Sequence, residues 1–299
     1  MSTASPALHA EGLDVGIVAY RSRDLLDACL TSLADNAPAR PMTIVVVDND
    51  SRDGTAEFAR GRPGVELIEA GRNLGFSAAT NLSLRRGRAR YFLALNPDTQ
   101  VQPGALDTLL ELMDGNPRIG IAGPRLERAD GTFDHAARRS FPTPLGALGH
   151  FTGIGRRAGA PAALAQYRAP EVERGPVDAV NGAFMLMRRS MLDEVGPFDE
   201  GYWLYMEDLD LCYRAAQAGW LTWYEPSVVV KHVKGASSGR HRALRANYAF
   251  HYGMARFYRR HYAASRSPFL GAAVYLGIGV KLVASSARSA LNRRVLGRA

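Results

Sequence analysis

The sequence predicts an α/β fold: a mostly parallel sheet covered by helices, followed by a helical C-terminal extension. Short apolar runs of strand length alternate with stretches of helical periodicity through residue 125, as in consecutive βαβ units. Two of the runs, TIVVV at 43–47 and YFLAL at 91–95, are uninterrupted, which is typical of strands buried on both faces. The chain of 299 residues is 46% hydrophobic, enough for a sizeable core.

Strands and helices alternate throughout the N-terminal half. Residues 1–12 are small and polar, and we expect them to be disordered. Leu26, Cys29 and Leu30 recur at helical spacing, which places a helix between the first two strands. In chain order we expect a strand at 13–20, a helix around 25–33, a strand at 43–47, a helix starting at 56–59, a strand at 65–69, a helix at 76–86, a strand at 91–95, a helix at 103–114 and a strand at 119–122.

The alternation stops in the middle of the chain. Residues 135–177 are rich in Arg, Ala, Gly and Pro and have weak periodicity, so we expect a long loop or insertion, a kind of segment that often carries function. Regular structure resumes at 177–188. A helix from 207, a strand at 227–230 and an aromatic, basic helix at 243–261 then complete a domain that spans 13–262.

Charge is distributed unevenly along the chain. The net charge is +8, yet from Lys231 onward there are fourteen Lys or Arg and no Asp or Glu, so the first 230 residues hold 23 basic and 29 acidic residues. The C-terminal quarter is therefore expected to face an anionic partner: nucleic acid, a phospholipid surface or a phosphorylated substrate. Apolar residues interleaved with the basic ones favour lipid over nucleic acid.

The C-terminal segment 263–299 is expected to form a basic, amphipathic helix. Its first part, PFLGAAVYLGIGVKLV, has 13 uninterrupted apolar residues before Lys281, too few to span a bilayer comfortably. With the arginines that follow, it is typical of an anchor on the surface of an anionic membrane. A helix that packs on the protein itself, or an oligomer interface, explains the pattern equally well.

No motif points to several other common enzyme classes. There is no GxxxxGK[ST] loop, no GxGxxG after a strand, no GxSxG elbow and no Cys/His zinc pattern. Cys29 and Cys212 fall on expected apolar helix faces, so buried thiols are favoured over a disulfide or a metal pair. No N-terminal segment resembles a signal peptide, and a cytoplasmic location fits these thiols.

The segment 196–220, GPFDEGYWLYMEDLDLCYRAAQAGW, carries the clearest sign of chemistry. An aromatic run leads to three carboxylates, Glu207, Asp208 and Asp210, at the start of a helix whose apolar face follows. An acid in this position could simply cap the helix. The tryptophan- and tyrosine-rich approach instead favours a carboxylate site beside an aromatic platform that meets a ring-shaped substrate.

Other polar groups follow the expected strands. Asp48 opens the run DNDSRDGT, Asp98 closes NPD, and His232 ends the last expected strand. Because ligands bind at the carboxyl ends of parallel strands, these groups and the acids at 207–210 are expected to converge. Each cluster alone also suits a polar turn or a helix cap. A lone carboxylate such as Asp98, near a histidine and a diphosphate, suits Mg²⁺ or Mn²⁺ with substrate phosphates completing the shell.

Six motifs, taken in order, resemble those of a known enzyme family. They are IVVVDNDSRDGT, GRNLGFSAATN, LALNPDT, VNGAFMLMRR, GPFDEGYWLYMEDLDLCYRAAQAGW and KHVKGASSG. Together they resemble family 2 inverting glycosyltransferases with the GT-A fold, most of all the bacterial rhamnosyltransferase-like branch. The resemblance covers residues 13–260. Any one motif is weak, whereas six in this order are specific.

The resemblance implies roles for individual residues. Asp208 matches the general base that deprotonates the acceptor hydroxyl. Asp98 and His232 match residues that hold a divalent ion, Mn²⁺ or Mg²⁺, against the donor diphosphate. The remaining expected site residues are Asp48, Ala19, Tyr20, Arg72, Asn96 and Gly182 for the nucleotide and donor, and Trp203, Tyr205 and Glu207 for the sugar and acceptor pocket. Asn96 replaces the first Asp of the family's DxD motif, and Arg21 stands where the early motif often has Asn.

The implied function is transfer of a sugar from a nucleotide diphosphate donor to a hydroxyl of a glycan or polyprenyl-diphosphate-linked acceptor, in cell-envelope polysaccharide synthesis. The branch implies L-rhamnose from dTDP-rhamnose. The alternative is galactosyl, galactofuranosyl, glucosyl or mannosyl transfer from a UDP or GDP donor. The enzyme would be cytoplasmic and peripheral on the inner face of the cell membrane. One base and no evident enzyme nucleophile fit a single displacement with inversion.

Three other classes of function are weighed against this one. A nucleotidyltransferase would also use an α/β sheet and a metal, but no Gly/Arg/Lys-rich triphosphate loop lies near the N-terminus. A nucleic-acid-binding protein is disfavoured by the acidic first 230 residues, and we expect no nucleic acid partner. A non-catalytic relative that binds nucleotide sugars is disfavoured by the presence of Asp98, Asp208 and His232. No pattern in the sequence indicates an oligomeric state.

Overall fold

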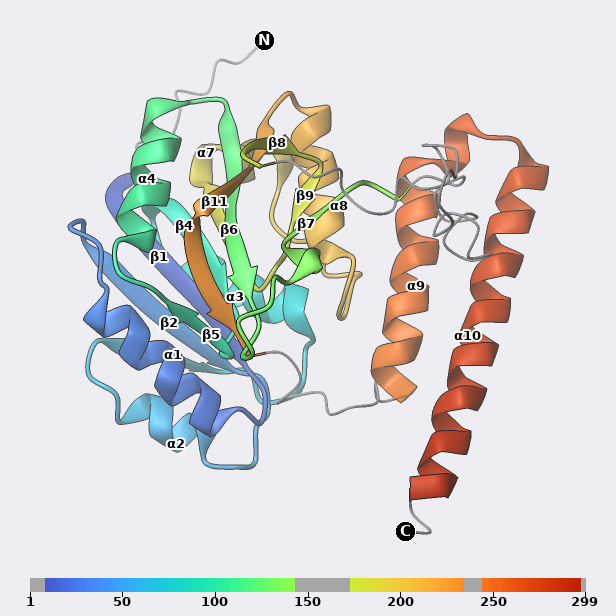
Figure 1. Ribbon diagram of the computed structural model, residues 1–299, viewed down its shortest axis with the longest axis horizontal. Helices are drawn as coiled ribbons and strands as arrows, with labels where there is room; N and C mark the ends of the chain where they lie inside the picture. Colours follow the sequence, from blue (N-terminus) through green and yellow to red (C-terminus); the bar gives the residue numbers. More distant parts are fainter. Residues whose placement is uncertain (1–8, 143–172, 234–243, 297–299) are drawn as a thin grey trace.

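A sheet of nine strands runs through the centre of the protein (Figure 1). The computed structural model describes residues 9–142, 173–233 and 244–296. Within these residues the strands lie in the order β3 (Val65–Glu69), β2 (Met42–Asp48), β1 (Ala10–Ala19), β4 (Ala89–Leu95), β10 (Phe184–Arg188), β6 (Ile119–Glu127), β11 (Leu221–His232) and β5 (Thr99–Val101), and β8 (Gly175–Val177) pairs with β11.

Most of the strands are parallel. β1 pairs in parallel with β2 and β4, β2 with β3, and β6 with β11. β10 is antiparallel to both of its neighbours, β4 and β6, and β5 is antiparallel to β11. Since β4 and β6 therefore point the same way, the carboxyl ends of the parallel strands share one edge of the sheet. The predicted α/β fold with a mostly parallel sheet is confirmed.

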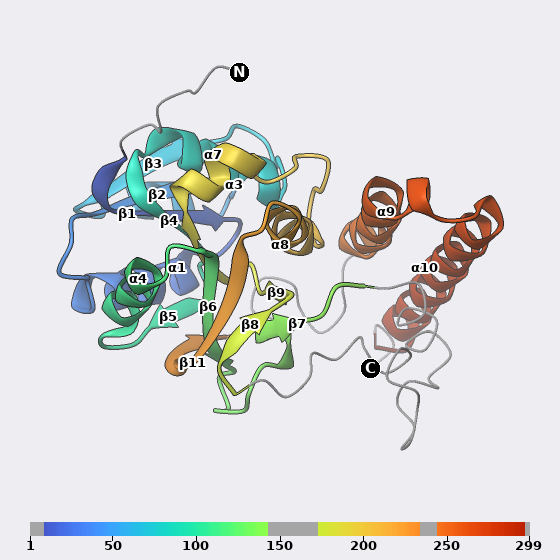
Figure 2. The ribbon, with the colours of Figure 1, turned by 90° about the horizontal axis from the view of Figure 1, so that it is seen from above.

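Helices cover both faces of the sheet (Figure 2). One face carries α1 (Arg23–Asp35), α2 (Thr55–Arg60) and α4 (Ala105–Gly115), and the other carries α3 (Phe76–Arg86), α7 (Arg189–Val195) and α8 (Glu207–Gln217). Along β4, Leu93 and Leu95 pack into the first layer, whereas Phe92 and Ala94 pack into the second. This double burial explains the uninterrupted apolar run. Cys29 and Cys212 are buried free thiols, as expected.

Two strands extend beyond the bounds that their local patterns predict. β1 begins at Ala10, so residues 10–12, expected to be disordered, belong to a strand, and the Ala10 amide donates to the Arg88 carbonyl (3.1 Å). The strand expected at 227–230 is the end of the longer β11, whose register shifts between Glu225 and Val229. That irregularity breaks the apolar pattern, which is why the first half of β11 was not predicted.

The segment expected to be a loop at 135–177 contains short elements at both ends. A 3₁₀ turn (His135–Ala137) leads into β7 (Arg138–Arg139), which pairs with β9 (Ala179–Val180), and β8 lies at its other end. Two- and three-residue strands have no periodicity to read, because distant partners define them. The middle of the segment, 143–172, lies outside the described residues.

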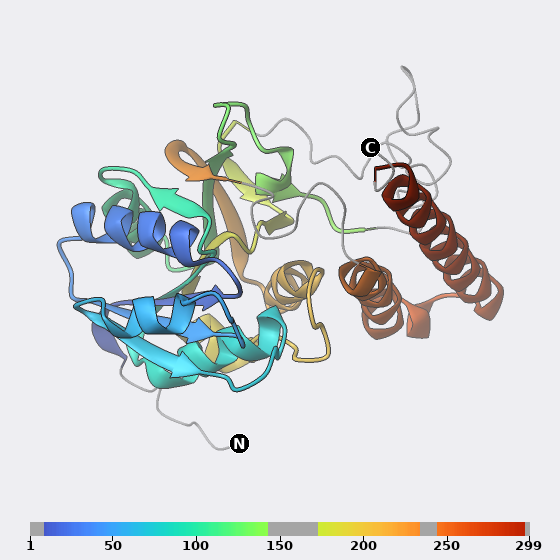
Figure 3. The same ribbon diagram turned by 90° about the horizontal axis from the view of Figure 1, so that it is seen from below.

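Helix α9 (Leu244–His261) is fastened to the second helical layer by buried charges. His261 shares a hydrogen bond with Asp210 of α8 (2.7 Å), and Arg256 grips both oxygens of Asp199 (2.9–3.0 Å). Tyr213 of α8 also stacks at an angle on the His261 ring, with 4.4 Å between ring centroids. α9 therefore packs as part of the main domain, and Figure 3 shows it beside α8.

Helix α10 (Pro268–Leu296) packs along α9 with one stripe and exposes the rest. Tyr275 meets Tyr258 edge-on at 5.6 Å, and the Asn247 amide donates to Ser285 and Ser286 (2.9 and 3.0 Å). Exposed apolar residues project from the other sides: Phe269 (88% exposed), Leu276, Val280 and Val283. Figures 1 and 3 show α10 on the far side of α9 from the sheet.

The observed α10 differs from the expected amphipathic helix with a short apolar stretch. The helix continues through Lys281, and the 23 residues Pro268–Ala290 are long and apolar enough to cross a membrane, judged by length and composition alone. Within this span only Lys281 and Arg288 are charged, and the exposed apolar side chains do not face a separate polar side of the helix. The run of 13 uninterrupted apolar residues before Lys281 is as counted from the sequence, and the longer span also includes Lys281 and Arg288.

Candidate active site

Hydrogen bonds tie the loops at the carboxyl edge of the sheet to one another. The Asn49 amide, just after β2, donates to the Ala19 carbonyl at the end of β1 (2.8 Å). The Asn96 amide, just after β4, donates to the carbonyl of Ala183 (2.9 Å). The neighbouring Gly182 amide donates in turn to the carboxylate of Asp208 (3.0 Å). The clusters expected to converge therefore do belong to one edge.

Asp48 ends β2 with its carboxylate buried and partly unsatisfied. One oxygen accepts from the Ser51 amide (3.1 Å), and the other, Oδ1, is buried and accepts no hydrogen bond from the described residues. Burial raises the pKa of Asp48, although the hydrogen bonds from Ser51 oppose this. A buried acceptor without a donor suits an N–H group of a ligand.

The other expected nucleotide contacts lie near Asp48 with different exposure. Ala19 is fully buried at the end of β1, and the next residue, Tyr20, is 37% exposed. Arg21 adopts a left-handed backbone (φ 51°), and its amide donates to the Ser51 hydroxyl (2.9 Å). Arg72 is exposed in the loop between β3 and α3. The side chain of Arg72 is thus free to reach a ligand. The buried Ala19 could contact a ligand only through its backbone.

Asp98 and His232 face each other, although they are far apart in sequence. Asp98 follows β4 and His232 ends β11, which is brought close by its pairing with β5. Nε2 of His232 lies 3.3 Å from Oδ1 of Asp98, and Nδ1 lies 3.5 Å from Oδ2 of Asp134. All three side chains are at most 9% exposed.

These residues fit a divalent ion that the substrate helps to bind. Asp98 Oδ1 is buried and accepts no hydrogen bond from the described residues, and the imidazole beside it offers a nitrogen ligand. The described part of the chain has no group of three His, Cys, Asp or Glu residues arranged as a metal cage. A protein site this sparse matches Mg²⁺ or Mn²⁺, whose remaining ligands are commonly phosphate oxygens and water.

The carboxylate of Asp208 is held from two sides. Arg139 of β7 donates to Oδ2 (2.5 Å) and also to the carbonyl of Val180 (2.9 Å). The Gly182 amide donates to the same Oδ2, and a side chain at Gly182 would begin 3.4 Å from it. Oδ1 accepts from the Leu209 amide (2.8 Å). Asp208 is therefore fixed in orientation at the first turn of α8.

A strained turn immediately before α8 positions the acids of its first turn. Tyr205 and Met206, immediately before α8, both have left-handed backbones (φ 71° and 74°), which is costly for residues with a side chain. Tyr205 packs edge-on against Phe250 of α9, which helps to hold the turn. Glu207 is buried, and burial, followed by the nearby charge of Asp208, raises the pKa of Glu207 to about 8. Its buried environment beside Asp208 thus favours the protonated form of Glu207.

Trp203 connects this turn to the loops that follow β2 and β3. Its carbonyl accepts from the Phe76 amide (2.7 Å), and a side chain at Gly75 would begin only 2.2 Å from that carbonyl. Gly75 also has a positive φ of 85°, so glycine is required there twice over. The Gly75 carbonyl accepts from the Asn49 side chain (3.2 Å). A short path of contacts therefore joins the Asp48 loop to the aromatic platform.

Asp210, the third acid of the cluster, points away from the site. It is fully buried and bonded to Tyr202, Arg214 and His261. It serves the packing of α8 against α9.

Sequence patterns did not identify three residues of this site. Arg139 and Asp134 lie at the edge of a stretch without periodicity, and Asn49 was part of a run that also suits a turn. A buried carboxylate such as Asp208 needs a charged or hydrogen-bonding partner. The arginines of the aperiodic segment were the one available signal for such a partner.

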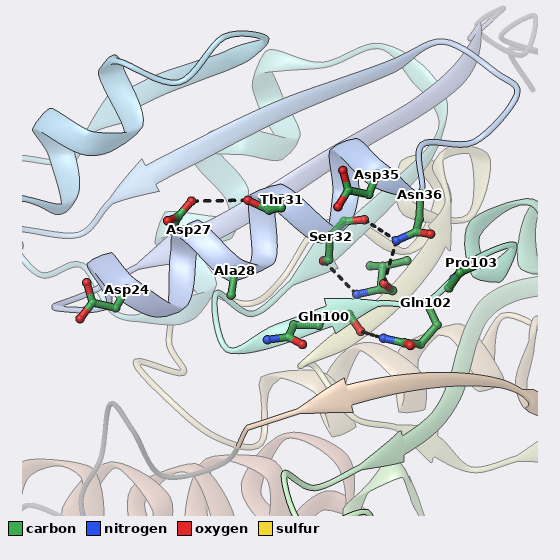
Figure 4. Close-up of a pocket in the computed structure, with 11 residues that line it drawn as sticks. Asp24, Asp27, Ala28, Thr31, Ser32, Asp35, Asn36, Gln100, Gln102 and Pro103 are labelled. Atoms are coloured by element: carbon green, nitrogen blue, oxygen red, sulfur yellow. Dashed lines mark hydrogen bonds between the residues drawn. The ribbon is translucent and has the colours of Figure 1, made fainter.

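An open hollow of about 460 Å³ lies elsewhere, between α1 and β5 (Figure 4). Polar side chains line it, among them Asp24, Asp27, Ser32 and Gln100, and several are bonded to one another or to backbone. None of the expected site residues lines this hollow, and we assign it no role.

The fold and the groups at its carboxyl edge define the class of GT-A glycosyltransferases. Within that class, the chain belongs to glycosyl transferase family 2, since the profile of Glycosyl transferase family 2 matches residues 14–196.

Two relatives share the rhamnosyltransferase-like branch. The chain is 37% identical over 241 residues to an N-acetylglucosaminyl-diphospho-decaprenol L-rhamnosyltransferase of Mycobacterium tuberculosis, covering 76% of this chain and 78% of the relative. It is 27% identical over 229 residues to the rhamnosyltransferase WbbL of Escherichia coli, covering 72% and 81%. The resemblance read from the six motifs is confirmed.

A solved structure shows the same fold at low sequence identity. The mannosyltransferase PcManGT from Pyrobaculum calidifontis, in complex with GDP-Man and Mn²⁺, superposes with a TM-score of 0.57 at 14% identity. The match covers 97% of this chain and 76% of that one.

Proposed function

We propose that this glycosyltransferase moves L-rhamnose from dTDP-rhamnose to a hydroxyl of a polyprenyl-diphosphate-linked acceptor. The observation that carries the proposal is the convergence of Asp208 with the loop of Asp98 through Gly182 and Ala183. The choice of sugar and acceptor is supported by the likeness to the mycobacterial enzyme, whose name states both.

Asp208 is proposed to be the general base. Arg139 and the Gly182 amide grip Oδ2 and orient the carboxylate, so it can receive the proton of the acceptor hydroxyl while that oxygen attacks the anomeric carbon. The bond from the anomeric carbon to the diphosphate breaks in the same displacement, which inverts the configuration. Positioned proton transfer of this kind is worth roughly 10²–10⁴-fold in rate.

The departing diphosphate is proposed to lie beside Asp98 and His232. Asp98 and His232 would hold a divalent ion there, and such an ion would supply positive charge to offset the charge that develops on the leaving group. Asp134 faces the other imidazole nitrogen of His232 (3.5 Å), and a carboxylate in that position holds the proton on Nδ1 and turns Nε2 towards Asp98. The carboxylate of Asp48 would accept a hydrogen bond from the thymine base.

We also propose that the enzyme sits on the inner face of the cell membrane, through α10. The exposed Phe269, Leu276, Val280 and Val283 form an apolar surface that water does not favour. α9 lies along α10 and carries Arg256, Arg259 and Arg260, which are costly within hydrocarbon. If this packing persists, α10 cannot cross the bilayer without drawing α9 in, so a peripheral position is favoured over a spanning one.

Nucleotide titration and one substitution test the enzymatic proposal. By calorimetry, dTDP should bind more tightly than UDP or GDP, and Mn²⁺ should strengthen its binding. Asp208→Asn should lower turnover by about 10²–10⁴-fold and leave dTDP binding nearly unchanged. Tighter binding of UDP or GDP would reassign the donor, and unchanged turnover of Asp208→Asn would remove Asp208 as the base.

A further inference from the structure

A second hollow, of about 310 Å³, lies between the Trp203 loop and the start of α9. Gly201, Trp203, Arg245, Tyr248, Ala249 and Tyr252 line it. The Arg245 guanidinium lies 4.0 Å from the centre of the Trp203 ring. Tyr248 and Tyr252 are 58% and 42% exposed, and their rings are nearly parallel, with 6.1 Å between centroids. The hollow thus combines one cation with three aromatic rings.

The walls of the hollow are fixed to the catalytic groups. Gly201 lies against the guanidinium of Arg256, where a side chain would begin 2.1 Å from Cζ, and Arg256 is clamped to Asp199. On α9, Gly253 contacts the strained turn that precedes Glu207, because a side chain there would lie 3.1 Å from the Tyr205 carbonyl. Trp203 itself is four residues before Glu207. A ligand in the hollow would therefore have a fixed position relative to the first turn of α8.

The chemistry of the lining indicates what would bind. A guanidinium recognises phosphate oxygens, and no acidic residue is among the described residues that line the hollow to repel them. Flat aromatic faces contact sugar rings and isoprenoid chains through apolar surface. A glycosyl diphosphate linked to a prenyl chain presents all three chemistries within a few ångströms. A free nucleotide could also use the rings and the cation, but no residue of the Asp48 loop is among the described residues that line the hollow.

We infer that this hollow, centred on Arg245 and Trp203, is the subsite for the diphosphate and first prenyl unit of the lipid-linked acceptor. The inference rests on the proposed function. α9 lines one side of the hollow. α10 packs on α9 and leaves its own apolar surface exposed. The acceptor would thus enter between the base and the membrane-facing helix, with its sugar towards Asp208 and its chain towards α10.

Binding of a short-chain prenyl-diphosphate-linked N-acetylglucosamine tests the subsite without a membrane. Arg245→Ala should raise its Kd and its KM by about tenfold or more, because a charge-assisted phosphate contact is lost. Turnover at saturating acceptor and the Kd for dTDP should stay unchanged, which also shows that the variant is folded. Arg245→Lys should recover part of the loss. Arg259→Ala, which removes the same charge from an exposed position on α9, is the matched control.

The outcomes separate this inference from the proposed function. An unchanged acceptor Kd in Arg245→Ala overturns the subsite, whether or not transfer is observed. Binding of the acceptor by the wild type without transfer of any sugar would instead reject the proposed reaction. If Arg245→Ala pellets less with anionic vesicles that lack acceptor, while its Kd for the short-chain acceptor is unchanged, then Arg245 contacts lipid headgroups and the subsite is likewise rejected.

Discussion

Asp208 owes its position to residues that are distant in sequence. Its own helix start was predicted from the acidic run and the apolar spacing that follows. Arg139, its ionic partner, lies 69 positions away in a segment with no periodicity. Local patterns identify a residue that begins an element, but they carry no information on which distant side chain meets it. Asp98 and His232, by contrast, were expected to converge because each follows an expected strand, and the resemblance to a family added their shared role.

Asp134 should act as a positioning residue for His232. Asp134→Asn keeps the hydrogen bond from the Ala136 amide but removes the charge beside Nδ1. Mn²⁺ affinity in the presence of dTDP should fall by about 10–100-fold, as for other carboxylates behind a metal-binding histidine. Titration calorimetry with Mn²⁺ measures this directly, with Asp98→Ala as the reference for a lost ligand. Equal Mn²⁺ affinity in Asp134→Asn and the wild type would show that Asp134 only caps its turn.

Glu207 should make the stability of the protein fall as the pH rises from about 4.5 to 8. Its pKa is 4.5 when unperturbed and about 8 when buried beside Asp208, so the folded protein keeps a proton that the unfolded chain releases. Glu207→Gln mimics the protonated acid and should remove this contribution. Urea unfolding of both proteins at pH 5 and pH 8 gives the comparison. A wild type that loses no more stability than the variant would contradict the prediction.

Helix α8 belongs to the site at its first turn and to the core through the rest of its length. Tyr205 and Met206 adopt left-handed backbone angles, which cost conformational free energy. The packing of α8 against α9 offsets that cost. Burial alone would raise the pKa of Asp210, but hydrogen bonds from His261 and Arg214 hold it below its usual value. This interaction stabilises the fold above the unperturbed pKa and is lost as the pH falls through the lowered one.

Asp210→Ala should therefore destabilise the protein strongly. Removing one partner of a buried ion pair typically costs about 3–5 kcal/mol, because the other charges remain buried. Urea denaturation at pH 7 measures the loss, which should shrink when the pH approaches 3. Asp130→Asn, on an exposed turn, should cause no measurable change. A small cost for Asp210→Ala would mean that Arg214 and His261 find other partners.

At the level of elements, the sequence predicted most of the helices and buried strands. It did not predict which strands pair with one another. The runs at 43–47 and 91–95 are uninterrupted because successive side chains of each strand pack against the helical layers on opposite faces of the sheet. The antiparallel placement of β10 between β4 and β6 has no local signal, since strand partners are chosen by the whole sheet. The count of uninterrupted apolar residues in α10 stopped at Lys281, whereas the helix itself continues through this lysine to Leu296.

The whole molecule consists of a layered α/β domain that carries the candidate site, the helix α9 packed against it, and the exposed apolar helix α10. Its charge follows the same division, since every basic residue from Lys231 onward lacks an acidic neighbour in sequence. The membrane role of α10 is proposed from this arrangement together with its exposed side chains.

Truncation after Tyr262 should release the enzyme from membranes. The shortened chain keeps His261, and thus the bond between α9 and Asp210. It should no longer pellet with anionic liposomes, whereas its Kd for dTDP should be unchanged. A full-length variant with Leu276→Glu and Val280→Glu tests the outer surface of α10 without removing the helix. Undiminished pelleting of both proteins would assign the membrane contact to another surface, and lost dTDP binding would show that α10 supports the fold.

The place of β10 in the sheet also bears on how the protein is made. β4 and β6 leave the ribosome well before Phe184, the first residue of the strand that separates them. At about 5–20 residues synthesised per second, β6 waits roughly 3–12 s and β4 roughly 5–19 s with an open edge before β10 is complete. Open edges invite pairing with other chains. We therefore expect nascent chains that stall before residue 188 to aggregate or to engage chaperones, and those released beyond His232, the last residue of β11, to complete the sheet.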